Sequence, residues 1–307
     1  MSDRRNFIKQ SGLGILGLSL LPQISFAKKD EVKITILHTN DMHSHIHPFK
    51  SGKNKGLGGM AQRAGLIKSI RSQENHVLLF DSGDIFQGTP YFNFYGGELE
   101  FKLMSKMKYD AATLGNHDFD NGLKGLKKQL PHANFPFLIA NYDFTKTILK
   151  DKFKPYKVFT KGKIKIGVFG ISIKLDGLVP KKLFGNTIYQ DPIDKANYYA
   201  SLLKQKEKCD LVICLSHLGF KYKTNKISDI NLASQTRNID LIIGGHTHTF
   251  LKKPVSILNL DKKEVLINQV GWAGINLGKV DFYFRQDYDL KRVHGGSIFV
   301  KSNTKNS

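Results

Sequence analysis

The fold of this chain is organised around the stretch Thr113-Leu114-Gly115-Asn116-His117-Asp118. An apolar segment leads into it, a glycine interrupts that segment, and three adjacent polar side chains follow. Asn116 offers a neutral oxygen to a metal ion, His117 offers a titratable nitrogen, and the Asp118 carboxylate could orient or charge that histidine. Because Gly, Asn and Asp all favour turns, these residues alone are also compatible with an ordinary turn. They indicate a metal centre only if other strand ends deliver ligands to the same place.

Four other apolar segments are followed by residues of metal-ligand type. These segments have the patterns expected of strands, and they cover residues 32–37, 76–80, 211–215 and 241–243. The candidate ligands that follow them are Asp41, His43, Asp84, His217, His246 and His248. Loops at the ends of buried strands are where α/β sheets place active sites, so we expect these side chains to converge with Asn116.

The chemistry of these ligands predicts the cofactor. They are nitrogen and oxygen donors without a thiolate, a set that suits Mn, Fe or Zn. Seven ligands are too many for one such ion. Two divalent ions about 3.5–4 Å apart, sharing one carboxylate, account for all of them.

The rest of the chain reads as further α/β structure. Helical patterns are predicted for residues 60–70, 97–107, 191–206 and 225–236. Strands are predicted for residues 111–114 and 137–140, for a hairpin of 156–160 with 164–171, and for an alternating region from 255 to 284. We expect one catalytic domain over residues 28–300, followed by a polar tail at 301–307, and we find no internal repeat.

Charge and composition limit the partners. The chain has 307 residues, of which 40% are hydrophobic, and its formal charge is +21 from 47 basic and 26 acidic residues. Such a balance favours anionic partners. Because the basic residues are spread along the chain, we interpret them as a solvated surface that steers phosphate substrates, and we expect no specific nucleic-acid binding.

Residues 1–27 have the layout of an export signal. The segment Arg4-Arg5-Asn6-Phe7-Ile8-Lys9 precedes a weakly apolar run over residues 12–21, and Ser25-Phe26-Ala27 offers small residues for cleavage. The paired arginines resemble a twin-arginine signal, which predicts an exported protein of the periplasm or cell envelope. The alternative is a retained signal that acts as an anchor. The apolar run of residues 12–21 is too short to span a bilayer. Beyond a possible retained signal, we expect no membrane span.

The two cysteines and several side chains near the motifs have ordinary interpretations. Cys209 and Cys214 bracket a strand that holds their Cα atoms roughly 16 Å apart, so no disulfide is expected. Asp81 is interpreted as a structural hydrogen-bond acceptor and Arg63 as part of a solvated helix face. The loop histidines are interpreted as supporting residues, and the aromatic cluster as a cleft floor, core packing or a docking surface. These residues are His45, His47, Phe86, Tyr91, Phe92, Phe94 and Tyr95.

The five motifs together resemble those of a known family. In chain order they are Asp-x-His, Gly-Asp, Gly-Asn-His-Asp, His and Gly-His-x-His, a set similar to that of the calcineurin-like metallophosphoesterases. The segments 38–43, 115–118 and 244–248 look most like the catalytic domain of 5′-nucleotidases. The resemblance covers about residues 32–285 and implies a four-layer αββα sandwich.

The resemblance also implies the role of each ligand. Metal one would take Asp41, His43, Asp84 and His248, and metal two would take Asp84, Asn116, His217 and His246. His117 and Asp118 would form the catalytic dyad. The implied activity is hydrolysis of nucleotide phosphomonoesters by a hydroxide that bridges the two metals.

One departure from the family pattern affects the substrate. The usual 5′-nucleotidase has a second, C-terminal domain that holds the nucleoside, and here the sequence stops soon after residue 284. We therefore expect that domain to be absent, with base recognition supplied by a separate chain if at all. Two alternatives stay open: a phosphodiesterase acting on cyclic nucleotides or nucleotide sugars, and a non-catalytic binding module that retains the fold.

Overall fold

The computed structural model describes residues 31–285 and 289–301. The predicted twin-arginine signal at residues 1–27 lies outside the described residues, as does the tail beyond Lys301. In the described part of the chain, no helix is both long and apolar enough to cross a membrane.

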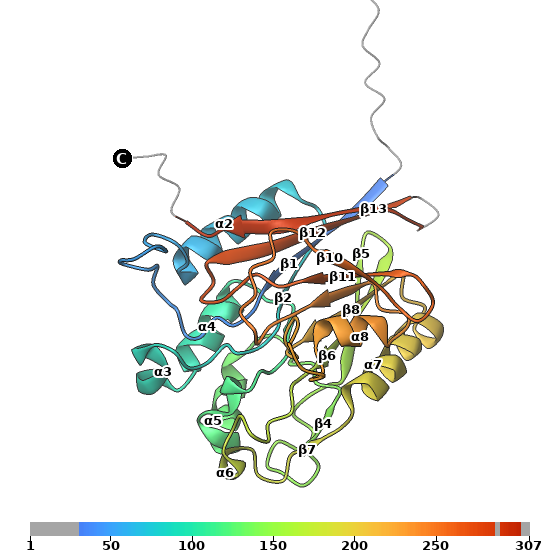
Figure 1. Cartoon of the computed structure of the whole chain (residues 1–307). Coiled ribbons are helices and arrows are strands. Elements are labelled where there is room, and N and C mark those ends of the chain that lie inside the picture. Colours follow the sequence, from blue (N-terminus) through green and yellow to red (C-terminus); the bar gives the residue numbers. More distant parts are fainter. Residues whose placement is uncertain (1–30, 286–288, 302–307) are drawn as a thin grey trace, which may run out of the picture. The chain divides into compact units, whose positions relative to one another are not determined.

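Two mixed β-sheets form the centre of the fold (Figure 1). The five-stranded sheet has the order β13-β12-β1-β2-β3, and its strands are β1 (Glu31–Thr39), β2 (Val77–Asp81), β3 (Ala111–Ala112), β12 (Asn276–Arg285) and β13 (Leu290–Phe299). The six-stranded sheet has the order β10-β11-β9-β8-β6-β5, and its strands are β5 (Tyr156–Lys161), β6 (Ile164–Ile171), β8 (Leu211–Ser216), β9 (Leu241–Ile243), β10 (Val255–Leu258) and β11 (Glu264–Asn268). A separate pair consists of β4 (Tyr142–Asp143) and β7 (Ile188–Tyr189).

Each large sheet contains a run of neighbouring parallel strands. In the first sheet β1, β2 and β3 are parallel neighbours, and in the second β6, β8, β9 and β11 are. Parallel strands are buried on both faces and read as continuous apolar runs. All six residues of β8, from Leu211 to Ser216, are buried, as expected of a strand covered on both faces. The carboxyl ends of the parallel strands therefore share one edge in each sheet.

The described residues also form α-helices. They are α2 (Met60–Gln73), α3 (Pro90–Tyr95), α4 (Glu98–Lys106), α5 (Gly122–Gln129), α6 (Lys181–Phe184), α7 (Pro192–Ser201) and α8 (Asp229–Ser234). The short helical turns are η1 (His117–Phe119), η2 (Leu130–His132) and η3 (Leu202–Lys206).

Three apolar clusters hold these layers together. The central cluster joins the inner faces of both sheets, with Ile36 and Phe282 from the first sheet and Val168 and Ile213 from the second. A second cluster packs α2 and α4 on the five-stranded sheet, and a third packs α7 and α8 on the six-stranded sheet. This is the predicted helix–sheet–sheet–helix arrangement, and the fold prediction is confirmed.

Several elements differ from the predictions. Residues 137–140 form only isolated bridges to Ala112 and Lys154, so the predicted strand is not formed there. The predicted helix over 225–236 is reduced to α8, because the Ser228 side chain accepts a hydrogen bond from the Asn231 amide and starts the helix at Asp229. Strand β13 was not predicted. It contains Gly295 and Gly296 and forms an antiparallel pair with β12.

The two cysteines behave as expected. Cys209 and Cys214 are both buried and free. Burial also raises the pKa of the Cys209 thiol to about 11, which keeps it protonated and unreactive at neutral pH. Within the described residues, the fold therefore rests on packing rather than on cross-links.

Candidate metal centre

Two groups of potential metal ligands lie where the parallel strands end. One group contains Asp41, His43 and His248, and the other contains Asp84, His217 and His246; within each group the ligand atoms all lie within 4.8 Å of one another. The loops after β1 and β2 supply the residues from the first sheet, and the loops after β8 and β9 supply those from the second. The two sheets thus contribute ligands to both groups.

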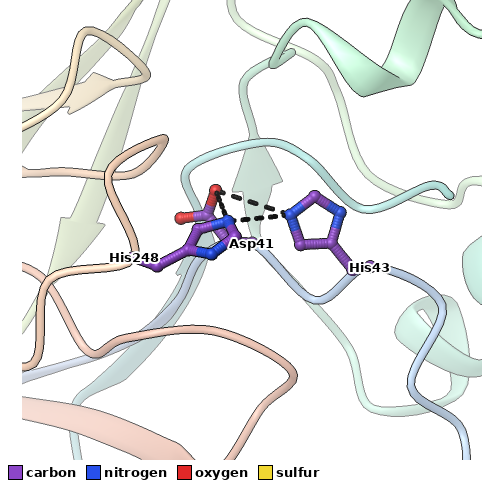
Figure 2. Close-up of side chains that lie close together, drawn as sticks. All are labelled: Asp41, His43 and His248. Atoms are coloured by element: carbon purple, nitrogen blue, oxygen red, sulfur yellow. Dashed lines mark hydrogen bonds and ion pairs between the residues drawn. The ribbon is translucent and has the colours of Figure 1, made fainter. Parts of the chain in front are cut away.

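The first group holds two histidine nitrogens face to face (Figure 2). His43 Nε2 lies 3.0 Å from His248 Nε2 and 3.9 Å from Asp41 Oδ1, and His248 Nε2 lies 3.4 Å from the same oxygen. His43 Nδ1 faces the Phe86 carbonyl oxygen at 3.3 Å, so Nδ1 carries the proton and Nε2 presents a lone pair. Converging lone pairs and a carboxylate repel one another unless a cation lies between them, so this group fits a metal ion.

The second group contains buried polar atoms without hydrogen-bond partners. His217 is fully buried and its Nδ1 donates to the Ser82 carbonyl oxygen at 2.6 Å, so Nε2 is the nitrogen that faces the other residues of the group. His217 Nε2 lies 3.1 Å from Asp84 Oδ2 without the geometry of a hydrogen bond, and Asn116 Oδ1 is also buried without a partner. Buried polar atoms nearly always have a hydrogen-bond partner, so these two atoms without one fit ligands of a second metal ion.

Asp84 lies between the two groups. Its Oδ2 is 3.1 Å from His217 Nε2 and 3.9 Å from His43 Nε2, so one carboxylate faces histidines of both groups. Burial alone would raise the pKa of Asp84, but the charge of His217 outweighs it and holds that pKa below its ordinary value. For His217 burial opposes the charged form, yet Asp84 raises the pKa of its imidazole to about 10. Without a metal ion the Asp84 carboxylate therefore favours a proton on His217 Nε2, and a bound cation would take the place of that proton.

The backbone at the ligands is held in an unusual conformation. Left-handed φ angles between 46° and 71° occur at Asp41, His43, Asp84, His246 and His248. Such angles are uncommon for residues other than glycine and cluster at functional sites. They let the chain reverse sharply at a strand end, so that residues two apart, such as Asp41 and His43, both face the centre.

Two glycines make the close approach of the loops possible. A Cβ atom at Gly115 would lie 2.1 Å from Asp84 Oδ1, and one at Gly245 would lie 2.8 Å from His217 Nδ1. Any side chain at either position would overlap a candidate ligand. Gly115 and Gly245 are therefore required because there is no room for a side chain, not because of their backbone conformation.

The structure pairs the His117 ring with a different carboxylate from the predicted Asp118. The Asp118 carboxylate does not bond to the His117 ring; it accepts hydrogen bonds from the backbone amides of Gly115, Asp84, Ile85 and Phe86 at 2.8–3.2 Å. His117 Nδ1 instead pairs with Asp120 Oδ2 at 2.9 Å. This hydrogen bond raises the pKa of His117, against the opposing effect of burial. Asp118 positions the Asp84 loop, and Asp120 orients the histidine.

Asp120 is a candidate site residue that the sequence analysis did not identify. The signal that could have found it is its spacing, because residues three apart lie on the same face of a helical turn, and η1 is such a turn. Asp118 is adjacent to His117 in sequence, and adjacent residues on a helical turn point in different directions.

The interpretations of the neighbouring residues have mixed outcomes. Asp81 is a structural acceptor as predicted, since it bonds to the Thr39 hydroxyl at 2.6 Å and to the Gly83 amide at 2.9 Å. Arg63 does not lie on a solvated face: it is fully buried and contacts Met42 Sδ beneath the ligand loop. The interpretation failed because α2 turns this residue toward the sheet.

The aromatic cluster after Asp84 divides into two parts. Phe86 and Phe92 are buried in the core, whereas Phe94 and Tyr95 on α3 have exposed fractions of 81% and 52%. Core packing therefore explains the first pair and leaves the second pair available to a partner.

Comparison with known proteins agrees with this site. The family model described as calcineurin-like phosphoesterase matches residues 34–250. A snake venom 5′-nucleotidase from Crotalus adamanteus is 33% identical over 291 residues, covering 87% of this chain and 48% of the relative. A 5′-nucleotidase from Vibrio cholerae serotype O1 is 37% identical, covering 76% and 43%. The crystal structure of a 5′-nucleotidase precursor from Thermus thermophilus superimposes with a TM-score of 0.78 at 29% identity, over 88% of this chain and 55% of that one.

A layered α/β fold with two ligand groups at its strand ends fits the class of enzymes that hold two metal ions. With the family match over most of its length, the chain belongs to the calcineurin-like phosphoesterases, as its motifs predicted. It is similar to the first half of 5′-nucleotidases, and it spans about half the length of the curated relatives it matches.

Proposed function

We propose that this chain is an exported dimetal phosphohydrolase that acts on nucleotide phosphomonoesters. The observation that carries the proposal is the pair of ligand groups, of which the second contains Asp84 and the first faces it across 3.9 Å at His43. Similarity to 5′-nucleotidases over 87% of this chain supports the substrate class. The twin-arginine-like segment at Arg4-Arg5 supports export to the periplasm or cell envelope.

The residues divide the work between metal binding and proton transfer. Asp41, His43 and His248 would hold metal one, Asn116, His217 and His246 would hold metal two, and Asp84 would contact both. When bound, a pair of divalent ions such as Mn, Zn or Fe lowers the pKa of water and neutralises phosphate oxygens.

His117 has the position and the protonation expected of a general acid. Its ring lies 5.3 Å, centroid to centroid, from that of His43, at the edge of the first group, and its Nδ1 is held by Asp120. Because Asp120 raises the pKa of His117, the imidazole is more often charged at neutral pH and can donate a proton to the departing ester oxygen. The same charge stabilises negative charge on the phosphoryl group.

The proposal is tested by phosphate release from AMP. The full chain, stripped with a chelator and reloaded with Mn²⁺, should hydrolyse AMP, and His217→Ala should abolish that activity because it removes a buried metal ligand. The matched control is His294→Ala, an exposed histidine on β13, which should keep full activity. A reloaded protein that binds two ions but hydrolyses no phosphoester would favour the alternative of a non-catalytic binding module.

Base recognition is proposed to come from outside the described residues. The chain spans about half the length of its 5′-nucleotidase relatives, and the exposed Phe94 and Tyr95 on α3 offer an aromatic surface next to the metal-ligand loops. A separate polypeptide that carries the nucleoside pocket is the proposed partner at this surface. Cyclic nucleotides and nucleotide sugars are the competing substrates.

A further inference from the structure

His248 differs from other histidines of the metal centre in how its ring is held. His43 and His217 are each anchored through Nδ1 by a backbone carbonyl, and both side chains are at least nine-tenths buried. The His248 side chain is 40% exposed, and in the described part of the chain its polar contacts run to Asp41 and His43, which are candidate ligands themselves. Histidine ligands normally need an outer partner that fixes the ring.

An aromatic ring takes the place of that outer partner. The indole of Trp272 stacks on the His248 imidazole with 5.8 Å between ring centroids and 9° between ring planes. His45 and Phe49 meet the same indole edge-on, at 5.1 Å and 5.8 Å. Parallel offset and edge-to-face contacts at these distances are the favourable geometries of aromatic pairs. The indole is thus held from its edge while its face contacts the histidine.

Backbone hydrogen bonds fix Trp272 to both ligand loops of metal one. The Ala273 amide donates to the Asp41 carbonyl oxygen at 2.7 Å, and the Gly271 amide donates to the Thr249 carbonyl oxygen at 2.9 Å. Asn40 bonds to the same turn, its amide donating to the Gly271 carbonyl oxygen at 2.6 Å. Gly271 and Ala273 both have left-handed φ angles, of 83° and 55°, so the turn around the tryptophan is specifically shaped.

We propose that Trp272 is a positioning residue for metal one: it holds the exposed His248 imidazole in the ligating orientation that buried carbonyls give to His43 and His217. This inference rests on the metal assignment of the proposed function and adds a residue that contacts no metal. It also distinguishes the two metal sites, since metal one includes a histidine held by an aromatic contact at the surface, whereas His217 of metal two is held by a buried hydrogen bond.

The sequence supplies a direct reporter, because Trp272 is the only tryptophan of the chain. Adding Co²⁺ to the chelator-stripped full chain should cause a saturable loss of tryptophan emission as metal one fills next to the indole. His248→Ala should reduce that loss more than His246→Ala does, because metal one lies nearer the indole than metal two. Two bound ions with unchanged emission, or equal loss in both variants, would overturn the inference while leaving the proposed function intact; absence of any bound ion would overturn both.

A pair of substitutions tests the positioning role itself. Trp272→Phe keeps a stacking ring and should retain both ions, and Trp272→Leu should weaken one of the two sites by about 10–100-fold, the usual effect of losing an outer-sphere partner. Metal content after dialysis and Co²⁺ titration monitored by visible absorption measure this, with circular dichroism to show that the fold is kept. Equal metal affinity in the Leu variant and the native chain would contradict the proposal. If the Leu variant does not fold, the emission experiment on the native chain decides.

Discussion

The Asp84 carboxylate faces histidines of both ligand groups, 3.1 Å from His217 Nε2 and 3.9 Å from His43 Nε2. We predict that the native chain binds close to two transition-metal ions and that Asp84→Ala loses both, because neither group keeps enough charge to hold a divalent ion. Elemental analysis of dialysed protein measures this. Asp261→Ala, which removes a surface carboxylate paired with Arg237, is the matched control and should keep both ions. A variant at position 84 that retains two ions would show that the carboxylate is not shared.

His117 should affect chemistry rather than folding, because its ring is half-buried at the edge of the site. We predict that His117→Asn keeps both metals and an unchanged melting temperature but lowers turnover by about 10²–10⁴-fold, the usual contribution of a positioned acid. Turnover is compared on AMP and on a phosphoester whose leaving group needs no proton. An equal loss on both substrates would assign the residue to charge stabilisation at the phosphoryl group instead of proton donation.

Asp120 should set the pH range over which His117 acts. A hydrogen bond from His117 to Asp120 raises the pKa of the imidazole. A general acid works while protonated, so turnover falls as pH rises through this pKa, and a raised value extends activity to higher pH. Asp120→Asn removes the negative charge and should move the falling limb of the turnover profile to lower pH. An unmoved limb would mean that a different group controls it.

The two sheets are joined by a buried polar contact between strands β1 and β11. His38 Nε2 on β1 accepts a hydrogen bond from Asn268 Nδ2 at 3.0 Å, and a Cβ atom at Gly278 on β12 would lie 2.1 Å from that nitrogen. The ring is fully buried, and burial lowers its pKa to about 3. His38 is therefore neutral in the folded protein, and there is no room for its proton to be solvated.

The burial of neutral His38 predicts that the free energy of unfolding decreases as the pH falls. Below the unfolded-state pKa of about 6.5, the unfolded chain binds a proton at His38 that the folded chain does not bind, so the free energy of unfolding falls by about 2 kcal/mol between pH 7 and pH 5. His38→Gln keeps an acceptor for Asn268 but cannot titrate, and should lose that part of the pH dependence. Urea unfolding of the metal-free protein at both pH values measures it, since the other histidines contribute equally to both proteins. Parallel pH curves would contradict the prediction.

At the scale of the whole molecule, residues 31–285 and 289–301 contain no site that we assign to base recognition. Two metals bind the phosphate of any phosphomonoester alike, whereas discrimination needs buried contacts worth a few kcal/mol. The described residues correspond to about half of a 5′-nucleotidase relative. We therefore predict that this chain alone hydrolyses AMP, GMP and a non-nucleotide phosphomonoester with weak affinity and similar efficiency, and a cyclic nucleotide more slowly. Micromolar, base-selective hydrolysis would show that the pocket lies within the described residues and would refute the partner proposal.

Local residue patterns were sufficient to predict most of the architecture. Strands such as β8 and β9 are continuous apolar runs, and burial on both faces makes such runs recognisable without any partner. Residues of metal-ligand type after those strands could be identified for the same reason, because their identity and position are properties of the chain itself. The pairing of β13 with β12 and the reduction of the predicted strand at 137–140 to isolated bridges could not, since both depend on neighbours remote in sequence.

The sequence by itself determined the family and the candidate ligands, through five motifs whose residues and order are local facts. Only the tertiary structure decided how the side chains pair. Asp118 is adjacent to His117, yet its carboxylate is taken by backbone amides from the loop after β2, which leaves the histidine to Asp120. Trp272 reaches His248 because its turn is bonded to Asp41 and Thr249, which lie far apart in the chain. Hydrogen bonds and ring contacts depend on distances in space, and these exist only once the two sheets have packed.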